Sequence, residues 1–304
     1  MKQDFIALAD FSTDTLHGIL STGLAMRERP EEFRDSLKGK TLGMIFRKRS
    51  TRTRISFEVG ILQLGGHGLV LSPNELQLSR GETIEDTARV LSRYLDAVMI
   101  RTFEHEEILE LAKYATVPVI NGLTDYNHPC QAMADMMTLR RHFGRLEGLK
   151  LAYLGDSNNV TVSLLAACLK FGMHMSIVSP PGYTLAPEVL NPFRKEAESL
   201  GLQVVLTENV EEGVAGADVV YTDTWTSMGQ EDEHEKRLRD LGRYQVDSRV
   251  MSLAGPGARF MHCLPAHRGE EVTQEVLDGE ASMVWEQAEN RLHIQKAILH
   301  FLMK

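Results

Sequence analysis

Short apolar segments alternate with longer segments of helical pattern along almost the whole chain, and this alternation leaves few possible folds. The apolar segments are residues 42–46, 67–71, 96–101 and 117–121 in the first half, and residues 150–154, 174–179, 203–206 and 217–222 in the second. Residues 132–143 and 187–200 are examples of the helical segments. Strands that alternate with helices at this spacing form βαβ units with parallel strands. We therefore predict an α/β fold in which each domain is a parallel β-sheet flanked by helices.

The length of 304 residues corresponds to about two domains, each large enough to have its own core. We expect the first domain to span residues 1–147 and to include a C-terminal helix at about residues 286–304. The second domain is expected to span residues 148–285. Within it, residues 230–243 are rich in charge, and we expect them to form a mobile or solvated segment.

The composition excludes several classes of protein. Hydrophobic residues make up 43% and charged residues 25% of the chain, as in ordinary soluble proteins. The net charge of −9 gives a nucleic-acid partner no general electrostatic support. No apolar run has transmembrane length, and acids lie near the N-terminus where a signal peptide would be apolar. The three cysteines follow no disulfide or zinc spacing, so we expect a cytoplasmic protein without a metal site.

A basic, hydroxyl-rich turn follows the first apolar segment. Ser50 and Thr51 lie where a helix should begin, because hydroxyl side chains satisfy the free N–H groups of a first turn. Arg52 and Arg54 add positive charge at this helix N-terminus, where the helix dipole already favours an anion. A cluster of basic residues can also be an ordinary solvated face. The position of this one directly after a strand favours a phosphate-binding site.

Other polar residues also follow predicted strands. Arg101 ends one apolar segment, His128 follows the next, and Asp223 and Cys263 lie at strand ends in the second half. Each has a structural explanation as well, since Arg101 can be a surface residue, His128 and Asp223 can cap helices, and Cys263 can be a buried thiol. Ligands of parallel sheets bind at the carboxyl ends of the strands. The shared position at strand ends therefore favours a binding site.

Five motifs occur in a fixed order. They are Ser-Thr-Arg-Thr-Arg at 50–54, Gln-Leu-Ser-Arg-Gly-Glu at 77–82, His-Pro-Cys-Gln at 128–131, Asp-Thr-Trp-Thr-Ser-Met-Gly at 223–229 and His-Cys-Leu-Pro at 262–265. In order and spacing, these motifs resemble those of the aspartate/ornithine carbamoyltransferase superfamily over essentially the whole chain. The last two resemble its ornithine branch.

The resemblance implies transfer of a carbamoyl group from carbamoyl phosphate to the δ-amino group of L-ornithine, giving L-citrulline and phosphate in arginine biosynthesis. The carbamoyl-phosphate-binding residues that it implies are Ser50, Thr51, Arg52, Thr53, Gln77, Arg101, His128, Gln131, Cys263, Leu264 and Arg291. The implied ornithine-binding residues are Asn159, Asp223, Ser227 and Met228. The implied catalytic residues are Arg52, Arg101, His128 and Cys263.

The resemblance also bears on partners and cofactors. No metal ion or organic cofactor is required, and the expected partners are the two small-molecule substrates. The family forms homotrimers or assemblies of trimers, and the loop with Gln77 is expected at a subunit contact. One departure from the family pattern is the run Arg47-Lys48-Arg49, which replaces an acid-containing version before Ser50.

Several alternatives remain at this point. An aspartate carbamoyltransferase would be expected to have a lysine in the loop that here holds Gln77 and Arg80, and cations where this chain has Asp223 and Cys263. Acetylated or succinylated ornithine and putrescine remain possible acceptors. A non-catalytic relative is disfavoured by the intact motifs. A nucleotide-binding protein is disfavoured because residues 155–159 lack the three-glycine phosphate pattern.

Overall fold

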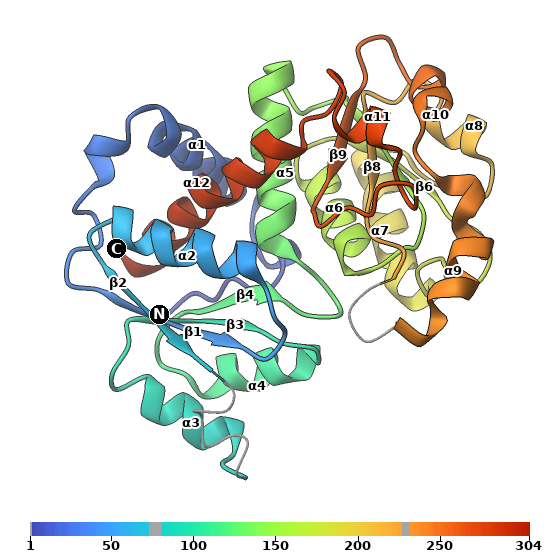
Figure 1. The fold of residues 1–304 in the computed structure, drawn as a ribbon. Coiled ribbons are helices and arrows are strands. Elements are labelled where there is room, and N and C mark those ends of the chain that lie inside the picture. Colours follow the sequence, from blue (N-terminus) through green and yellow to red (C-terminus); the bar gives the residue numbers. More distant parts are fainter. Residues whose placement is uncertain (1, 73–80, 227–230) are drawn as a thin grey trace. The chain divides into compact units, whose positions relative to one another are not determined.

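The computed structural model describes residues 2–72, 81–226 and 231–304, and the chain divides into two compact units. The first unit consists of Met1–Met137 and Glu289–Lys304, and the second of Thr138–Ala288. Each unit has one sheet whose strands are all parallel, with helices on both faces (Figure 1). The predicted α/β class with two parallel sheets is therefore confirmed.

The sheet of the first unit has four strands in the order β2-β1-β3-β4. Their bounds are β1 (Thr41–Phe46), β2 (His67–Leu71), β3 (Ala97–Arg101) and β4 (Val119–Leu123). The chain passes from β1 to β2 on one side and then returns to β3 on the other, so the direction of winding reverses between β1 and β3. Phe46 is the last residue of β1 and Arg101 the last residue of β3, and the two are partners in the register. Loops that leave this point diverge, which makes it a favourable place for a ligand.

Helices cover both faces of this sheet (Figure 1). The elements that belong to the first unit, wholly or in part, are η1 (Leu8–Asp10), α1 (Thr13–Glu28), η2 (Pro30–Phe33), α2 (Thr51–Gln63), α3 (Ile84–Leu91), α4 (His105–Tyr114), α5 (Pro129–Phe143) and α12 (Val284–Met303). On one face, Ile108 of α4 packs into a buried cluster with Val98 and Ile100 of β3. On the other, α2 and α12 approach closely, because a Cβ added at Gly60 would lie 3.3 Å from the Cγ of Lys296.

The sheet of the second unit has five strands in the order β7-β6-β5-β8-β9. Their bounds are β5 (Lys150–Leu154), β6 (His174–Val178), β7 (Val204–Thr207), β8 (Val219–Thr222) and β9 (Arg259–His262). Here the direction of winding reverses between β5 and β8, whose last residues Leu154 and Thr222 are partners in the register. The turns at residues 155–158 and 223–226 therefore start from adjacent strand ends.

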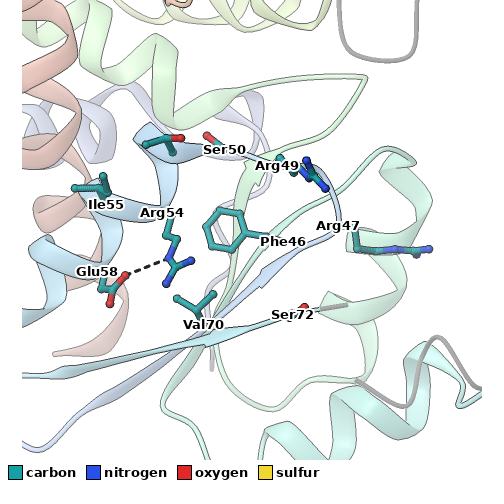
Figure 2. A pocket seen from close by; sticks show the side chains of 10 residues that line it. Phe46, Arg47, Arg49, Ser50, Arg54, Ile55, Glu58, Val70 and Ser72 are labelled. Atoms are coloured by element: carbon teal, nitrogen blue, oxygen red, sulfur yellow. Dashed lines mark hydrogen bonds and ion pairs between the residues drawn. The ribbon is translucent and has the colours of Figure 1, made fainter. Parts of the chain in front are cut away.

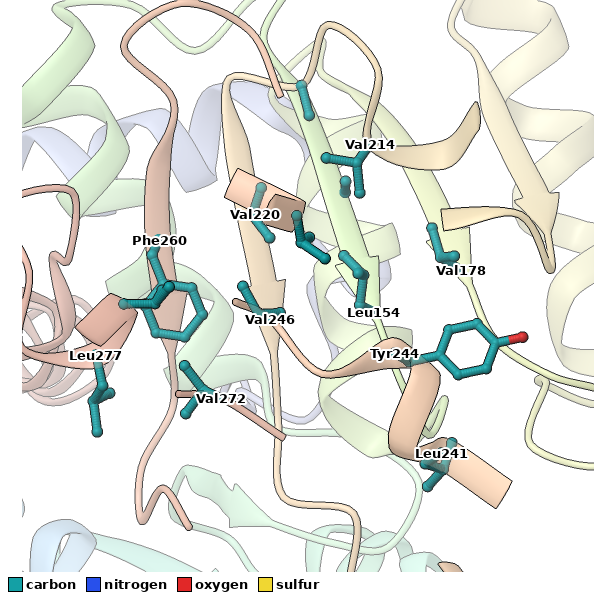
Figure 3. Packing of buried hydrophobic residues seen from close by; sticks show 14 of the residues in the cluster. Leu154, Val178, Val214, Val220, Leu241, Tyr244, Val246, Phe260, Val272 and Leu277 are labelled. Carbon is teal, nitrogen blue, oxygen red and sulfur yellow. The ribbon is translucent and has the colours of Figure 1, made fainter. Parts of the chain in front are cut away.

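One face of the second sheet packs against a buried apolar cluster (Figure 3). Val178 and Phe260 come from strands, whereas Val214, Leu241 and Leu277 come from helices. The remaining elements of this unit are α6 (Asn159–Lys170), α7 (Pro187–Leu200), α8 (Val210–Val214), η4 (Glu231–Glu233), α9 (His234–Leu241), η5 (Gly242–Tyr244), α10 (Ser248–Leu253) and α11 (Gln274–Leu277).

Most predicted elements are present with bounds that differ by one to three residues. The predicted helix at 187–200 and the predicted strands at 67–71 and 150–154 have the observed bounds. Helix α5 was expected at residues 132–143 but begins at Pro129, because proline suits the first turn of a helix. His128 therefore lies immediately before a helix. None of the described helices is long and apolar enough to cross a membrane.

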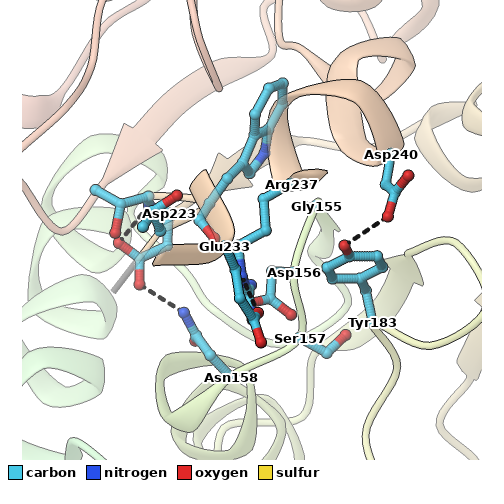
Figure 4. Close-up of polar contacts among 12 residues, drawn as sticks. Gly155, Asp156, Ser157, Asn158, Tyr183, Asp223, Glu233, Arg237 and Asp240 are labelled. Carbon is cyan, nitrogen blue, oxygen red and sulfur yellow. Dashed lines mark hydrogen bonds and ion pairs between the residues drawn. The ribbon is translucent and has the colours of Figure 1, made fainter. Parts of the chain in front are cut away.

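The prediction that residues 230–243 form a mobile or solvated segment holds for the exposure of most described residues in it, but it misses a helix and two buried side chains. Residues 234–241 form α9, and the side chain of Arg237 is buried (Figure 4). Arg237 Nη1 lies 2.6 Å from a carboxylate oxygen of Asp156 and 2.9 Å from the carbonyl oxygen of Trp225. Leu241 is also fully buried. The charge pattern suggested that these side chains contact solvent, but Arg237 has a buried partner in Asp156.

This ion pair should contribute to stability in a pH-dependent way. Burial raises the pKa of Asp156 to about 6, although Arg237 opposes the rise. Arg237→Met leaves an unpaired buried carboxylate, which should lower the free energy of unfolding by about 3–5 kcal/mol near pH 8. The loss should shrink near pH 5, because a carboxyl with a raised folded-state pKa is protonated there and needs no cation. Denaturant titration at both pH values measures this.

A matched control is Arg239→Met, since Arg239 is exposed on the same helix. It should change the free energy of unfolding by less than about 0.5 kcal/mol. Equal losses in the two variants would contradict a role for the buried pair.

Candidate active site

The turn after β1 is organised by hydroxyl groups. Ser50 is the N-cap of α2, as predicted, and its Oγ accepts a hydrogen bond from the backbone N–H of Thr53 at 3.2 Å. The same hydroxyl donates to Thr53 Oγ1 at 2.9 Å, and Thr53 is fully buried. Arg291 of α12 donates from Nη2 to Thr53 Oγ1 at 2.7 Å. The first turn of α2 is therefore fixed by its own cap and by an arginine 238 residues later in the chain.

Arg101, at the end of β3, connects this turn to the sheet. Its carbonyl oxygen accepts backbone hydrogen bonds from Arg47 at 2.9 Å and from Lys48 at 3.3 Å. The Arg101 side chain is largely buried, as is the imidazole of His128 before α5. Two strand exits thus place side chains beside the N-terminus of α2.

Three guanidinium groups lie close enough to His128 to affect its titration. Burial lowers the pKa of His128 well below its ordinary value, and the positive charges of Arg291, Arg101 and Arg52 lower it further. The imidazole is therefore neutral at physiological pH. A neutral imidazole surrounded by cations can donate a hydrogen bond without acting as a strong acid.

This cluster has the character of an anion site. The N-terminus of α2 and the three arginines all favour negative charge. The Nε of Arg52 is buried, and no hydrogen-bond acceptor for it exists among the described residues. A buried donor without an acceptor is costly, so a bound anion would stabilise the arrangement.

Gln131 adds a neutral polar group on the first turn of α5. Its side chain is almost fully buried, and Nε2 donates to Asp135 at 2.8 Å. Its Oε1 is buried and accepts no hydrogen bond from the described part of the chain. Asp135 therefore fixes the amide so that its carbonyl oxygen remains available to accept an N–H.

The extra basic residues before Ser50 are largely neutralised by carboxylates. Arg47 pairs with Glu107, and Lys48 Nζ lies 2.9 Å from Asp125. Their positive charge is therefore compensated within the first unit. The departure from the family pattern does not add these two cations to the cluster around His128.

A surface hollow of about 750 Å³ adjoins the turn (Figure 2). Ser50 and Thr51 line it, together with Arg49, Arg54 and Glu58. Arg54 and Glu58 form an ion pair within it at 3.5 Å. Arg101 and His128 do not line this hollow. It therefore borders the cluster of buried cations without containing it.

In the second unit, Asp223 is the centre of a hydrogen-bonded group at the carboxyl end of β8. Its Oδ2 accepts from Asn158 Nδ2 at 2.8 Å (Figure 4), and its Oδ1 lies 2.9 Å from Cys263 Sγ. The backbone N–H of Thr224 also donates to Oδ1, at 2.8 Å. Asp223 is largely buried. A buried carboxylate fixed by three donors is suited to binding a cation or an amine.

The turn after β9 has an unusual backbone. Leu264 has φ of 58°, the left-handed region that non-glycine residues seldom adopt, and a cis peptide bond precedes Pro265. The Leu264 N–H donates to His262 Nδ1 at 2.8 Å. His262 Nε2 in turn lies 3.1 Å from Glu271 Oε1. A fully buried pair thus supports the turn that carries Cys263.

The predicted site residues fall into two groups, one in each unit. In the first unit, Ser50 and Arg291 both donate to Thr53 Oγ1, and the charges of Arg52, Arg101 and Arg291 act on His128, while Thr51 is exposed. Gln131 lies one turn beyond His128. In the second unit, Asp223 contacts Cys263, Leu264 follows Cys263, and Asn159 begins α6. Gln77, Ser227 and Met228 lie outside the described residues.

Some residues of these groups were not predicted. Asn158 donates to Asp223, and it also caps α6. An asparagine before a helical segment is a recognised capping signal, so this residue could have been found from sequence. Glu271 and Arg237 had no such signal, because their partners are distant in sequence or lie on another element.

Two protein-family models match the chain. The model described as aspartate/ornithine carbamoyltransferase, carbamoyl-P binding domain, matches residues 3–141. The model described as aspartate/ornithine carbamoyltransferase, Asp/Orn binding domain, matches residues 147–302. The second match extends over residues 289–302, which belong to the first compact unit.

Known proteins similar to the chain agree with these models. The ornithine carbamoyltransferase of Symbiobacterium thermophilum is 55% identical over 304 residues, covering 99% of this chain and 98% of the relative. The solved ornithine carbamoyltransferase of Pyrococcus furiosus is 48% identical, with a TM-score of 0.95 and coverage of 99% of this chain and 97% of that one. An acetylornithine transcarbamylase complexed with acetylcitrulline is 31% identical, with a TM-score of 0.89 and 99% coverage of both chains.

The buried, neutral His128 predicts a specific dependence of stability on pH. The lowered folded-state pKa means that the unfolded chain takes up a proton below its pKa of about 6.5 while the folded chain does not. Stability should therefore fall as pH decreases below about 6.5, by up to about 1.4 kcal/mol per pH unit from this residue. His128→Gln should remove that share, as measured by denaturant titration between about pH 4 and pH 8.

The control is His17→Gln, which replaces an exposed histidine. Its pH profile should parallel that of the unmodified protein. If the His128→Gln profile does so as well, the imidazole does not resist protonation in the folded state.

Proposed function

The chain belongs to the aspartate/ornithine carbamoyltransferase family, and we propose that it transfers the carbamoyl group of carbamoyl phosphate to the δ-amino group of L-ornithine, giving L-citrulline and phosphate. Family membership confirms the resemblance that the five motifs indicated. The observation that carries the proposal is the neutral imidazole of His128 among Arg52, Arg101 and Arg291. A neutral donor among fixed cations suits a substrate that has both a phosphate and a carbonyl group.

The phosphate of carbamoyl phosphate is assigned to the N-terminus of α2. Ser50, Thr51 and Thr53 would supply hydroxyl and backbone donors, and Arg52 would supply a guanidinium whose buried Nε lacks an acceptor in the described chain. As phosphate leaves, negative charge increases on its oxygens. Fixed donors at a helix N-terminus stabilise that charge without rearranging.

The carbamoyl group is assigned to the neighbouring donors. Arg101, His128 and Thr53 would donate to its oxygen, which becomes negative in the tetrahedral intermediate. Gln131 would accept a hydrogen bond from the carbamoyl NH₂ through its available Oε1. Donor and acceptor groups would then fix the plane of the carbamoyl group for attack.

The acceptor amino acid is assigned to the second unit. Asp223, with Asn159, Ser227 and Met228, would bind ornithine, and Cys263 and Leu264 would lie beside the reacting groups. Only a neutral amine can attack the carbamoyl carbon, so the δ-ammonium must lose a proton. The departing phosphate is a suitable acceptor for it, and this scheme requires no cofactor.

The nature of Asp223 favours ornithine over aspartate as the acceptor. A buried carboxylate would repel the second carboxylate of aspartate, whereas it would attract the α-ammonium group of ornithine. Acetylornithine is the second candidate, because a solved relative is named for that activity. A blocked α-amino group would leave Asp223 without a charged partner, so free ornithine is favoured.

The proposal includes the organisation of the protein. The carbamoyl-phosphate domain would comprise residues 1–147 with the C-terminal helix from about residue 286, and the ornithine domain residues 148–285. The active form would be a homotrimer or an assembly of trimers in the cytoplasm, with Gln77 at a subunit contact. Size-exclusion chromatography with light scattering tests the oligomeric state.

The deciding experiment is a carbamoylation assay with ornithine, acetylornithine, putrescine and aspartate in parallel. We expect turnover with ornithine to exceed that with each other amine by at least about a hundredfold in kcat/KM. A higher kcat/KM with another amine would show that this amine, and not ornithine, is the acceptor. Absence of turnover with all four would contradict the enzymatic proposal itself.

Arg52→Ala should lower kcat/KM by about 10²–10³, because it removes a buried donor from the phosphate site. Arg54→Ala is the matched control, since Arg54 lies on the same helix turn but pairs with Glu58 at the surface. Its effect should be below about threefold. Circular dichroism should report folded protein for both, and similar activities would place the phosphate elsewhere.

Asp223→Asn keeps the shape of the side chain but removes its charge. We expect KM for ornithine to rise by at least about tenfold, because a charged hydrogen bond to the substrate is lost, while KM for carbamoyl phosphate stays within about twofold. Steady-state kinetics with each substrate varied in turn separates the two constants. A parallel rise of both constants would indicate a general structural defect instead.

A further inference from the structure

A group of imidazole and carboxylate side chains lies beside the turn after β9, apart from the residues assigned to the substrates. His267 Nδ1 is 3.8 Å from Glu270 Oε2 and 3.9 Å from Glu271 Oε2. One donor atom from each residue lies within 4.8 Å of the others. His234, the first residue of α9, also approaches Glu270, with its Nε2 3.7 Å from Glu270 Oε1.

Glu271 is the most informative member of this group, because its side chain is fully buried. Its Oε1 is used twice, since it lies 3.1 Å from His262 Nε2 and accepts the backbone N–H of His267 at 2.6 Å. Its Oε2 is buried and has no hydrogen-bond donor within the described ranges. This oxygen points toward His267, at a distance too long for a hydrogen bond.

Glu270 presents a second oxygen of the same kind. Its Oε2 is buried and likewise finds no hydrogen-bond donor in the described part of the chain. His234 is oriented by a hydrogen bond between its Nδ1 and Thr226 Oγ1 at 3.1 Å, which leaves Nε2 directed at Glu270. His234 therefore approaches Oε1 of Glu270, whereas Oε2 has no donor in the described part of the chain.

We propose that His267 Nδ1, Glu270 Oε2 and Glu271 Oε2 bind a divalent first-row transition ion such as Zn²⁺. Two donors at about 2.1 Å from a tetrahedral ion are separated by about 3.4 Å. The separations of 3.8 and 3.9 Å are thus near those of ligands to one ion and outside hydrogen-bonding range. One imidazole with two carboxylates suits Zn²⁺, Co²⁺ or Mn²⁺.

The group formed by Asp223, His262 and Cys263 is a less suitable metal site. His262 Nδ1 accepts the Leu264 N–H and Nε2 faces Glu271, so neither nitrogen is available to a metal ion. Asp223 is already bonded to Asn158 and Thr224. At the site that includes His267, by contrast, Glu271 Oε2 accepts no hydrogen bond from the described residues.

The ion would join two segments of the second unit. Glu271 connects it to His262, whose Nδ1 supports the turn at Leu264, and Glu270 connects it to His234 at the start of α9. Ion binding would therefore stabilise the turn that carries Cys263. The effect is on the fold of this segment and requires no step of carbamoyl transfer to pass through the metal.

The test uses the full chain after treatment with a chelator, with Zn²⁺ titration followed by calorimetry and Co²⁺ titration followed by absorption. The expected results are one ion per chain, a higher melting temperature with Zn²⁺, and a Co²⁺ spectrum without a thiolate charge-transfer band. His267→Ala and Glu270→Gln, both at partly exposed positions, should each weaken binding by at least about tenfold.

Cys263→Ser is the matched control, because it removes the thiol of the other candidate group. Binding in this variant should equal that of the unmodified protein. No saturable binding in the unmodified chain would overturn the proposal. Undiminished binding in His267→Ala and Glu270→Gln, or a thiolate band that disappears in Cys263→Ser, would overturn it as well.

Discussion

The structure of the first unit depends on concentrating positive charge in a place where little water can reach it. Arg101 and Arg291 are largely buried, and His128 lies among them in its neutral form. Such an arrangement is unfavourable unless the surrounding fold is rigid enough to maintain it. The cap of α2, the hydrogen bond from Arg291 to Thr53 and the register of β1 with β3 provide that rigidity. A bound dianion would then reduce the electrostatic repulsion among these arginines.

Each unit places its charged residues where the strand order of its sheet reverses, and the charges have opposite sign in the two units. In each, the chain reverses its winding direction once, between β1 and β3 or between β5 and β8. The first reversal gathers arginines, and the second gathers Asp223 with Asn158 and Cys263. A parallel sheet creates such a position regardless of sequence, so the chemistry is determined by the few residues in the loops that leave it.

Local patterns predicted the elements and the cap well, because both depend on neighbouring residues. Ser50 was predicted to begin a helix from its hydroxyl and its position after an apolar strand, and it does so. The interpretation of residues 230–243 missed the burial of Arg237, because its partner is Asp156, 81 residues earlier. No periodicity reveals such a pair. The roles of His128 and Arg291 came from resemblance, since their mutual proximity is likewise invisible in the local sequence.

The backbone hydrogen bonds from Arg47 and Lys48 to the carbonyl of Arg101 limit how this chain can evolve. Because Phe46 and Arg101 are register partners at the two strand ends, a deletion of one residue in β1 would shift the turn relative to Arg101 by about 3.3 Å and turn alternate side chains to the opposite face. Insertions and deletions should therefore be tolerated in the loops at the amino ends of these strands and not within β1 or β3. The spacing between the strand and Ser50 is as strongly constrained as the identity of Ser50 itself.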